Sequence, residues 1–258
     1  MVISKVVLIY FSPTGGTLRA ARMMAGEFRA PVEEIDLTGQ HAPRARELGR
    51  DELALVAVPC YGGRVPELAA QRLTHFLGRE TPALAVVTFG GRAVDDALRE
   101  LGGILTGIGF VPVAGVAAVA EHSLARQFAA GRPDDADRAE LRAFAMKVRA
   151  KLGGLRNAPE GEVQLGGDEP YRKAGRVPVR PEAGRECVGC GACARACPAG
   201  AIDPERPRHA DPRACMSCMR CVKACPHGVR ALPAFARRLI SFKCKCMSGR
   251  HAANSLIL

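Results

Sequence analysis

Eight of the eleven cysteines fall into two runs with identical spacing, and this pattern constrains the chain more than any other feature. The first run holds Cys187, Cys190, Cys193 and Cys197, and the second holds Cys215, Cys218, Cys221 and Cys225. Each run reads C-x2-C-x2-C-x3-C-P, and the two runs are the only internal repeat in the sequence. The apolar content of this region is too low to hold it together alone, so we expect its fold to depend on metal.

This spacing is the one with which bacterial ferredoxins hold 4Fe–4S clusters. Three thiolates two residues apart face one iron–sulfur cube, and the fourth, before the proline, ligates the neighbouring cluster. The sequence therefore predicts two clusters with reciprocal ligands: Cys187, Cys190, Cys193 and Cys225 for one, and Cys215, Cys218, Cys221 and Cys197 for the other. Zinc and disulfides are the alternatives, but tetrahedral zinc sites use two separated cysteine pairs and not one short run.

The charge of the chain is concentrated in its cysteine-rich part. From residue 170 onward there are 17 Lys and Arg against 5 Asp and Glu, a net +12, whereas the preceding residues carry a net charge of −1. One interpretation is docking onto an acidic redox partner, since complementary fields speed encounter. The other is an arginine-rich composition with no recognition role. Nucleic-acid binding is disfavoured, because no aromatic residues interleave with these arginines to stack on bases.

The sequence predicts no membrane span. The apolar start, residues 1–10, lacks a basic beginning and a small-residue cleavage site, so it is better explained as a buried strand than as an export signal. The uncharged stretch at residues 104–120 is short and interrupted by glycines and a proline. Thiolate ligands need a reducing compartment, which predicts a cytoplasmic location.

Strand and helix patterns alternate through the first part of the chain. Predicted strands lie at 2–11, 32–37, 53–58, 83–89 and 111–119, and predicted helices at 18–28, from 66 onward, 93–105 and 134–152. Such alternation predicts right-handed crossovers and a parallel sheet. We expect domain boundaries at 1–153, 185–233 and 234–258, with a Gly-, Pro- and charge-rich linker at 154–184. The tail after residue 233 starts like a helix and ends without clear structure.

A glycine-rich turn follows the first strand and carries Ser12, Thr14, Gly15, Gly16 and Thr17. Converging backbone amides and the helix dipole favour an anion there, so a phosphate is the expected guest. The turn contains no lysine, which excludes the triphosphate-binding P-loop. Its S-x-T-G-x-T pattern resembles the FMN-phosphate loop of flavodoxins, and above all of short-chain flavodoxin-like domains fused to a bacterial-type ferredoxin. The alternative is a capped strand–helix turn without ligand.

This resemblance implies two further loops beside the flavin ring. They follow the third and fourth strands and comprise Pro59, Cys60, Tyr61, Gly62 and Gly63, and then Phe89, Gly90, Gly91 and Arg92. Members of the fusion family often read Tyr-Gly-Asn-Arg in the second loop, so Phe89 and Gly91 depart from the pattern and remove a hydroxyl and an amide. Arg92 either stabilises an anionic flavin or pairs with Asp95 or Asp96.

Four other residues, one histidine and three cysteines, are candidates for lesser roles. His122 either relays a proton to flavin or, more in keeping with isolated histidines, caps a strand end. Cys60 is expected to be a small apolar filler beside the flavin. Cys244 and Cys246 are interpreted as non-ligands, because the eight cluster positions are already filled.

The chain resembles flavodoxin–ferredoxin fusion proteins over nearly its whole length. The resemblance implies an α/β fold: a doubly wound, five-stranded parallel sheet of order 2-1-3-4-5, followed by a small α+β two-cluster ferredoxin domain. It implies FMN and two 4Fe–4S clusters as cofactors, and electron transfer with redox partner proteins as the function, more as a carrier than as an enzyme. An FMN-dependent reductase and a redox-sensing binding protein are the alternatives. No dinucleotide fingerprint follows a strand, which disfavours direct use of NAD(P)H.

Overall fold

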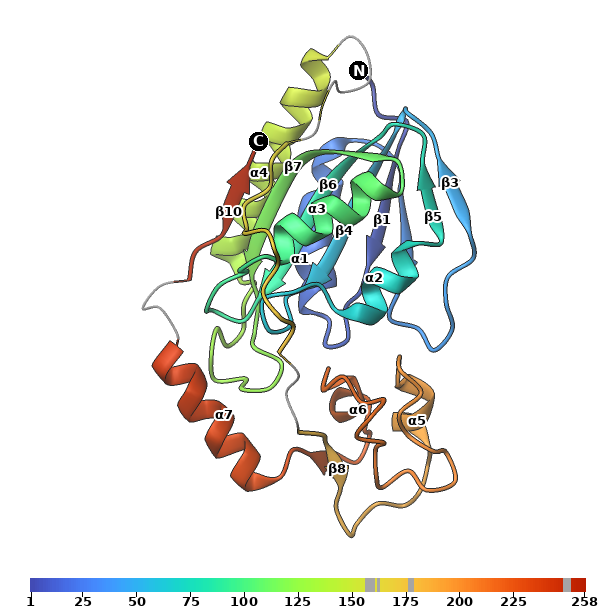
Figure 1. Ribbon diagram of the computed structural model, residues 1–258, viewed down its shortest axis with the longest axis vertical. Coiled ribbons are helices and arrows are strands. Elements are labelled where there is room, and N and C mark those ends of the chain that lie inside the picture. Colours follow the sequence, from blue (N-terminus) through green and yellow to red (C-terminus); the bar gives the residue numbers. More distant parts are fainter. Residues whose placement is uncertain (156–160, 162, 176–178, 248–251) are drawn as a thin grey trace.

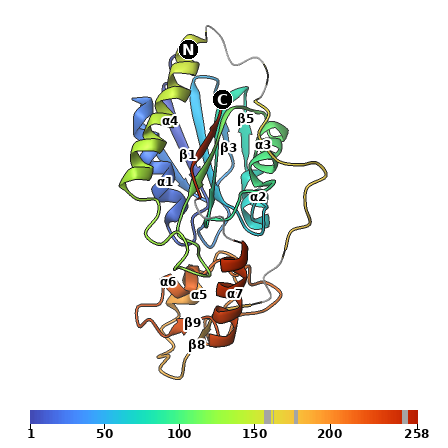
Figure 2. The same cartoon turned by 90° about the vertical axis from the view of Figure 1, so that its left-hand side faces the viewer.

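The computed structural model describes residues 1–155, 161, 163–175, 179–247 and 252–258, and the side chains of Cys246 and Met247 lie outside this description. Two units are visible in Figure 1: an α/β unit, residues 1–155 and 252–258, and a cysteine-rich unit, residues 179–233. The cysteine-rich unit lies beyond one end of the strands of the α/β unit, in both views of the molecule (Figures 1 and 2).

The main sheet has six strands in the order β10-β7-β6-β4-β1-β2. Its members are β1 (Lys5–Tyr10), β2 (Val32–Asp36), β4 (Glu52–Pro59), β6 (Thr81–Phe89), β7 (Phe110–Val119) and β10 (Ser255–Ile257). The first five are mutually parallel, with Val6 paired to Val32 on one side and to Leu53 on the other. In chain order these five strands are arranged 2-1-3-4-5, which confirms the expected flavodoxin-like topology.

Alternate residues of the strands enter two separate apolar layers. Val6 and Leu8 face the layer shared with Met24 of α1, whereas Val7 and Ile9 face the opposite layer. This period of two is the pleat of a strand buried on both faces. Helices α1 (Gly16–Ala25) and α4 (Asp135–Gly154) cover one face, and α2 (Glu67–Leu73) and α3 (Ala97–Gly107) cover the other (Figure 2).

Three short elements were not predicted from the sequence. A single 3₁₀ turn, η1 (Gly26–Phe28), ends α1, and β3 (Arg46–Leu48) pairs in parallel with β5 (Phe76–Gly78) in a separate two-stranded sheet. The described helices include none long and apolar enough to cross a membrane.

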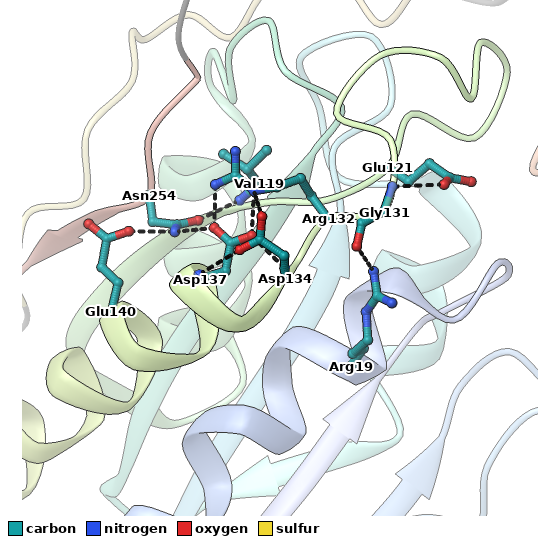
Figure 3. Close-up of polar contacts among 9 residues, drawn as sticks. All are labelled: Arg19, Val119, Glu121, Gly131, Arg132, Asp134, Asp137, Glu140 and Asn254. Carbon is teal, nitrogen blue, oxygen red and sulfur yellow. Dashed lines mark hydrogen bonds and ion pairs between the residues drawn. The ribbon is translucent and has the colours of Figure 1, made fainter.

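The expectation that the tail ends without clear structure is wrong. Strand β10 pairs antiparallel with β7, so the end of the chain extends the main sheet. Asn254, just before β10, is buried and makes three hydrogen bonds: it accepts from the Val119 amide at 2.8 Å and donates to Asp137 at 2.7 Å and Glu140 at 2.6 Å (Figure 3). These contacts lie more than 110 residues away along the chain, which is why local pattern gives no sign of the strand.

The segment between the units runs along α3. Val163 donates to the Pro112 carbonyl, and Leu165 inserts into the core beside Gly102 and Gly115. Asp96 then accepts hydrogen bonds from the amides of residues 168 and 172. The described part of the expected linker is thus fastened to the α/β unit before the chain enters the cysteine-rich unit.

The cysteine-rich unit contains only short elements. They are β8 (Glu182–Ala183), α5 (Ala192–Ala196), α6 (Arg220–Lys223) and β9 (Arg230–Ala231), with β8 and β9 antiparallel. Helix α7 (Ala234–Met247) follows and lies to one side of the cysteine-rich unit in Figure 1. Gln127 of the α/β unit donates to Ser241 of this helix at 2.6 Å.

Candidate functional site

A cleft of about 760 Å³ lies between the two units, at the carboxyl ends of β1, β4, β6 and β7. In open α/β sheets this is the place where ligands bind. The lining includes all three predicted loops: Thr14, Gly16 and Thr17 from the first, Pro59, Cys60 and Tyr61 from the second, and Phe89 and Gly90 from the third. Ser12, Gly15, Gly62, Gly63, Gly91 and Arg92 are not among its described lining residues.

The first loop has the geometry of an anion site. Gly15, with φ of 88°, turns the chain in the left-handed region and brings Gly16 and Thr17 to the start of α1, where the first amides have no carbonyl partner within the helix. Two of the three predicted hydroxyls are used by the fold itself. Ser12 accepts a hydrogen bond from the Leu18 amide, and Thr17 bonds to the Thr88 hydroxyl at 2.7 Å. Backbone amides and Thr14 are therefore the groups available to a phosphate.

The cysteine-rich unit brings a lysine to this loop. Lys223, in α6, donates to the carbonyl of Thr14 at 2.7 Å, and its Nζ lies 2.8 Å from the point where a Cβ of Gly15 would stand. The loop itself contains no lysine, as its sequence predicts. The contact with Lys223 was not predicted, because this residue lies more than 200 positions away along the chain. A basic residue in the second cysteine run was the only available signal.

The second loop places a thiol and a phenol against the cleft. Cys60 is half-buried, with its thiol 3.5 Å from the Val94 carbonyl, and burial raises its pKa to about 11. Burial also raises the pKa of Tyr61 well above its usual value, and Cys218 of the cysteine-rich unit adds to that effect. Both groups are therefore protonated at neutral pH, and Tyr61 lies between the two units.

The third loop is packed tightly against His122. A Cβ on Gly90 would lie 2.5 Å from the ring of His122, so only glycine fits there. Phe89 is buried in a small cluster with Ala117 and Val119, and one edge of it reaches the cleft. Arg92 forms an ion pair with Asp95, the second of its two predicted alternatives.

His122 has a structural role, because its ring holds the backbone of the turn that follows it. Its Nδ1 accepts hydrogen bonds from the amides of Leu124 and Ala125, each at 3.2 Å. The proton of the neutral ring therefore sits on Nε2, which lies 3.6 Å from Cys244 Sγ, and burial lowers the pKa of His122. His122 also lines the cleft. The prediction for Cys246 falls outside the described side chains.

Two pockets in the cysteine-rich unit divide the eight cysteines. The outer pocket is lined by Cys187, Cys190, Cys193 and Cys225, and the inner pocket by Cys197, Cys215, Cys218 and Cys221. The four cysteines of each pocket line a small cavity. Among the described residues, no three His, Cys, Asp or Glu side chains lie close enough together to hold a single metal ion.

A cysteine thiol must lose its proton to bind metal, and the surroundings of these thiols shift their pKa values in both directions. Burial raises the pKa of Cys218 to about 12, and the nearby thiols of Cys221, Cys197 and Cys215 act in the same direction. Burial raises the pKa of Cys225 too, but hydrogen bonds from the backbone amides that follow it outweigh this effect and lower the pKa. Four sulfurs gathered in each pocket, with amide donors around them, are a donor set that fits an iron–sulfur cluster.

The inner pocket adjoins the cleft, and the outer pocket does not. Cys215 lines both the inner pocket and the cleft, together with Met216. Met216 also packs against the core of the α/β unit, and Arg72 of α2 donates to the Pro198 carbonyl at 2.9 Å. No cysteine of the outer pocket is among the described residues that line the cleft.

One family model matches a segment within the cysteine-rich unit. Residues 186–229 match the 4Fe-4S dicluster domain family. No curated protein matches the chain. Similar solved structures include the rubredoxin:oxygen oxidoreductase of Desulfovibrio gigas (21% identity, 58% of this chain, 36% of that chain, TM-score 0.40) and a flavodoxin of Streptococcus pneumoniae TIGR4 (17% identity, 57% and 99%, TM-score 0.39). A short-chain flavodoxin associated with a bacterial microcompartment gives 13% identity, 59% and 100% coverage and a TM-score of 0.40.

This chain spans only about a third of the oxidoreductase, 36% of its length. The assignment of the fold rests on the strand order, and that of the cysteine-rich unit on the family match. The chain therefore joins a flavodoxin-like α/β unit to a ferredoxin-type 4Fe–4S unit. This combination defines an iron–sulfur protein with a role in electron transfer or flavin-dependent oxidation and reduction.

Proposed function

We propose that the chain is an electron-transfer protein in which two 4Fe–4S clusters and one FMN exchange electrons with a separate redox protein. One observation carries this proposal: Cys215, a ligand in the proposed inner cluster, lines the same cleft as the phosphate-loop residue Thr14 and the ring-loop residue Tyr61. A flavin in that cleft would be next to the inner cluster, within the short distance that electron transfer needs.

FMN fits the cleft by the chemistry of its lining. The amides of Gly16 and Thr17, with Thr14, would hold the phosphate, and Lys223 adds a positive charge beside that loop. When bound, FMN supplies a centre that takes electrons in pairs and passes them singly, or the reverse. Tyr61, Phe89 and Met216 supply apolar walls for the ring and exclude water from it.

The clusters take the reciprocal ligand sets. We assign Cys215, Cys218, Cys221 and Cys197 to the inner cluster and Cys187, Cys190, Cys193 and Cys225 to the outer cluster, which the cysteines lining each pocket support. In this arrangement the inner cluster is next to FMN and the outer cluster is farther from it. The covalent connection keeps the three centres at a fixed effective concentration that separate carriers would reach only by diffusion.

Helix α7 is the proposed docking surface for an acidic redox protein. Phe235, Leu239 and Phe242 are exposed at 72%, 52% and 67%, and they lie four and three residues apart on one side of the helix. Arg237, Arg238 and Lys243 are exposed among them. An apolar stripe flanked by cations fits a partner with an apolar patch and an acidic rim. A rate of reduction by acidic ferredoxins that stays the same from low to high salt contradicts this assignment.

The cofactors are tested by counting them in the purified chain. Protein prepared without oxygen is expected to contain about eight iron and eight sulfide atoms and about one FMN per chain, since each cluster holds four of each atom. Iron without flavin overturns the FMN site, and flavin without iron overturns the clusters. A thiolate-bound cluster also implies a reducing compartment such as the cytoplasm.

The same preparation separates a carrier from the alternatives. The cofactors of a carrier should be oxidised and reduced only by a redox protein or by an artificial donor or acceptor. Turnover of NAD(P)H with a small acceptor, in the absence of any partner protein, would identify a reductase instead. Salt-sensitive binding to DNA would identify a sensor.

A further inference from the structure

The two cysteine runs differ at one buried position that follows each of them. After its fourth cysteine and proline, the first run continues Ala-Gly-Ala-Ile and ends at Ile202, whereas the second continues His-Gly-Val-Arg and ends at Arg230. Both side chains are buried, with Ile202 at 4% exposure and Arg230 at 2%. One half of the repeat therefore buries an apolar side chain and the other a permanent cation.

The guanidinium of Arg230 is held by carbonyls and directed at sulfur. Nη1 donates to the Pro207 carbonyl at 2.5 Å and lies 3.5 Å from Cys193 Sγ, and Nη2 donates to the Pro181 carbonyl at 3.2 Å. Nε is buried and has no hydrogen-bond partner among the described residues. Cys193 belongs to the outer pocket, which Arg230 itself helps to line.

The position of Arg230 associates it with the outer pocket. It lines that pocket together with Cys193, and it is not among the described residues that line the inner pocket.

No carboxylate neutralises this cation. Within the described part of the chain, Arg230 forms no ion pair with any Asp or Glu, although it is almost fully buried. Burying an unpaired charge is strongly unfavourable, so such groups are normally paired or bound to something charged. The groups that face it are cysteine sulfurs and backbone carbonyls, and only the sulfurs become anionic when metal binds.

We propose that Arg230 is the counter-charge of the outer cluster and raises its reduction potential. This inference rests on the proposed function. Adding an electron makes a thiolate-bound cluster more negative, and hydrogen bonds to its sulfurs together with nearby charge set its potential. A buried cation in a region of low dielectric constant stabilises the reduced state of the cluster beside it.

The test is a redox titration of the cluster-loaded protein, followed by electron paramagnetic resonance so that both clusters are observed. In Arg230→Met, a neutral side chain of similar length, the ratio of reduced to oxidised outer cluster at a fixed potential is expected to fall about tenfold. That change corresponds to about 59 mV for a one-electron couple. Arg230→Lys keeps the charge and should stay near the wild-type ratio. Ile202→Met, at the matching position of the first run, is the control and should change neither cluster.

Each outcome decides the proposal. Loaded Arg230→Met protein in which the potential of the outer cluster is unchanged overturns it. If Arg230→Met binds no iron, Arg230→Lys decides. Iron and potentials that are retained in Arg230→Lys show that the charge is required. Loss of iron in Arg230→Lys as well means that Arg230 only holds the carbonyls of Pro181 and Pro207, which overturns the proposal. A wild-type chain without iron would refute the proposed function instead.

Discussion

The α/β unit and the cysteine-rich unit are held together in different ways. The α/β unit buries two layers of aliphatic side chains, one on each face of its sheet. Among the described residues, the core cluster of the cysteine-rich unit has seven buried residues, of which three are cysteines and three are alanines. Alanine buries little apolar area, so this cluster contributes far less than a Leu- or Val-rich core of the same number of residues.

The difference shows what each kind of cofactor site demands of the chain. The proposed flavin cleft is made of loops at the ends of strands that are already fixed by the apolar core. The cluster pockets are the centre of their unit, so the cofactor and the fold depend on one another. The two units also differ in charge. The part of the chain that forms the sheet is nearly neutral, and the part that holds the cysteines is strongly basic.

Removal of iron should have the largest effect, because it should unfold one unit and leave the other folded. We expect an anaerobic chelator to abolish the protection of backbone amides against hydrogen exchange from residue 180 to 232 and to leave the strands of the main sheet protected. The reason is that the cysteine-rich unit has too small an apolar core to persist without metal–sulfur bonds. Hydrogen-exchange mass spectrometry reports both units in one sample. A protected cysteine-rich unit in iron-free protein would show that the two units are stabilised in the same way.

Acid should affect the α/β unit through one buried carboxylate. Although burial raises the pKa of Asp137, hydrogen bonds from Arg132 and Asn254 outweigh it and lower the pKa from 3.8 to about 2. A lowered pKa gives stability that is present above pH 4 and is lost as the pH falls from 4 towards 2. The loss is on the order of 2 kcal/mol, since one pKa unit corresponds to about 1.4 kcal/mol.

Urea unfolding of the α/β unit, followed by far-ultraviolet circular dichroism at several pH values, measures this loss. Asp137→Asn should be less stable than the wild type at pH 6 and should lose less stability between pH 4 and pH 3. Asp135→Asn is the control, because its carboxylate lies in the same helical turn and is 96% exposed. If Asp137→Asn and the wild type lose stability in parallel over that range, the carboxylate is not the source of the acid sensitivity.

The sequence was sufficient for the features that depend on local pattern. The five parallel strands follow from apolar runs alternating with helical periodicity, and the iron–sulfur unit follows from a spacing that few other sites share. These signals are strong because each is contained within one short segment of the chain.

The missed features are contacts between distant segments. The short strand Ser255–Ile257 has no alternation of its own, and it is fixed by Asn254 contacting Val119 and α4. Arg230 had no expected role, because a charged residue after a cysteine run gives no sign of being buried. Lys223 was predicted as part of a basic region, and nothing local indicates that it reaches Thr14.

Lys223 is the residue of the cysteine-rich unit that contacts the phosphate loop of the proposed flavin site. It therefore gives the test with the smallest expected effect on the difference between the two units. We expect Lys223→Met to weaken FMN binding about fivefold, or about 1 kcal/mol, which is the scale of one hydrogen bond or ion pair at a partly exposed site. Riboflavin, which lacks the phosphate, should bind with unchanged affinity. Quenching of flavin fluorescence in titrations of both ligands, at low and high salt, provides the measurement.

Two controls decide what the lysine does. Lys243→Met removes an exposed charge from α7 and should leave both affinities unchanged, which excludes an effect of net charge alone. Equal weakening of FMN and riboflavin in Lys223→Met would mean that the substitution distorts the loop and that the lysine does not act on the phosphate. In the iron-free protein the substitution should have no effect on FMN, because the unfolded cysteine-rich unit no longer presents Lys223 to the loop. An undiminished effect there would mean that α6 stays docked without its cluster, and the α/β unit would then help to order the cysteine-rich unit.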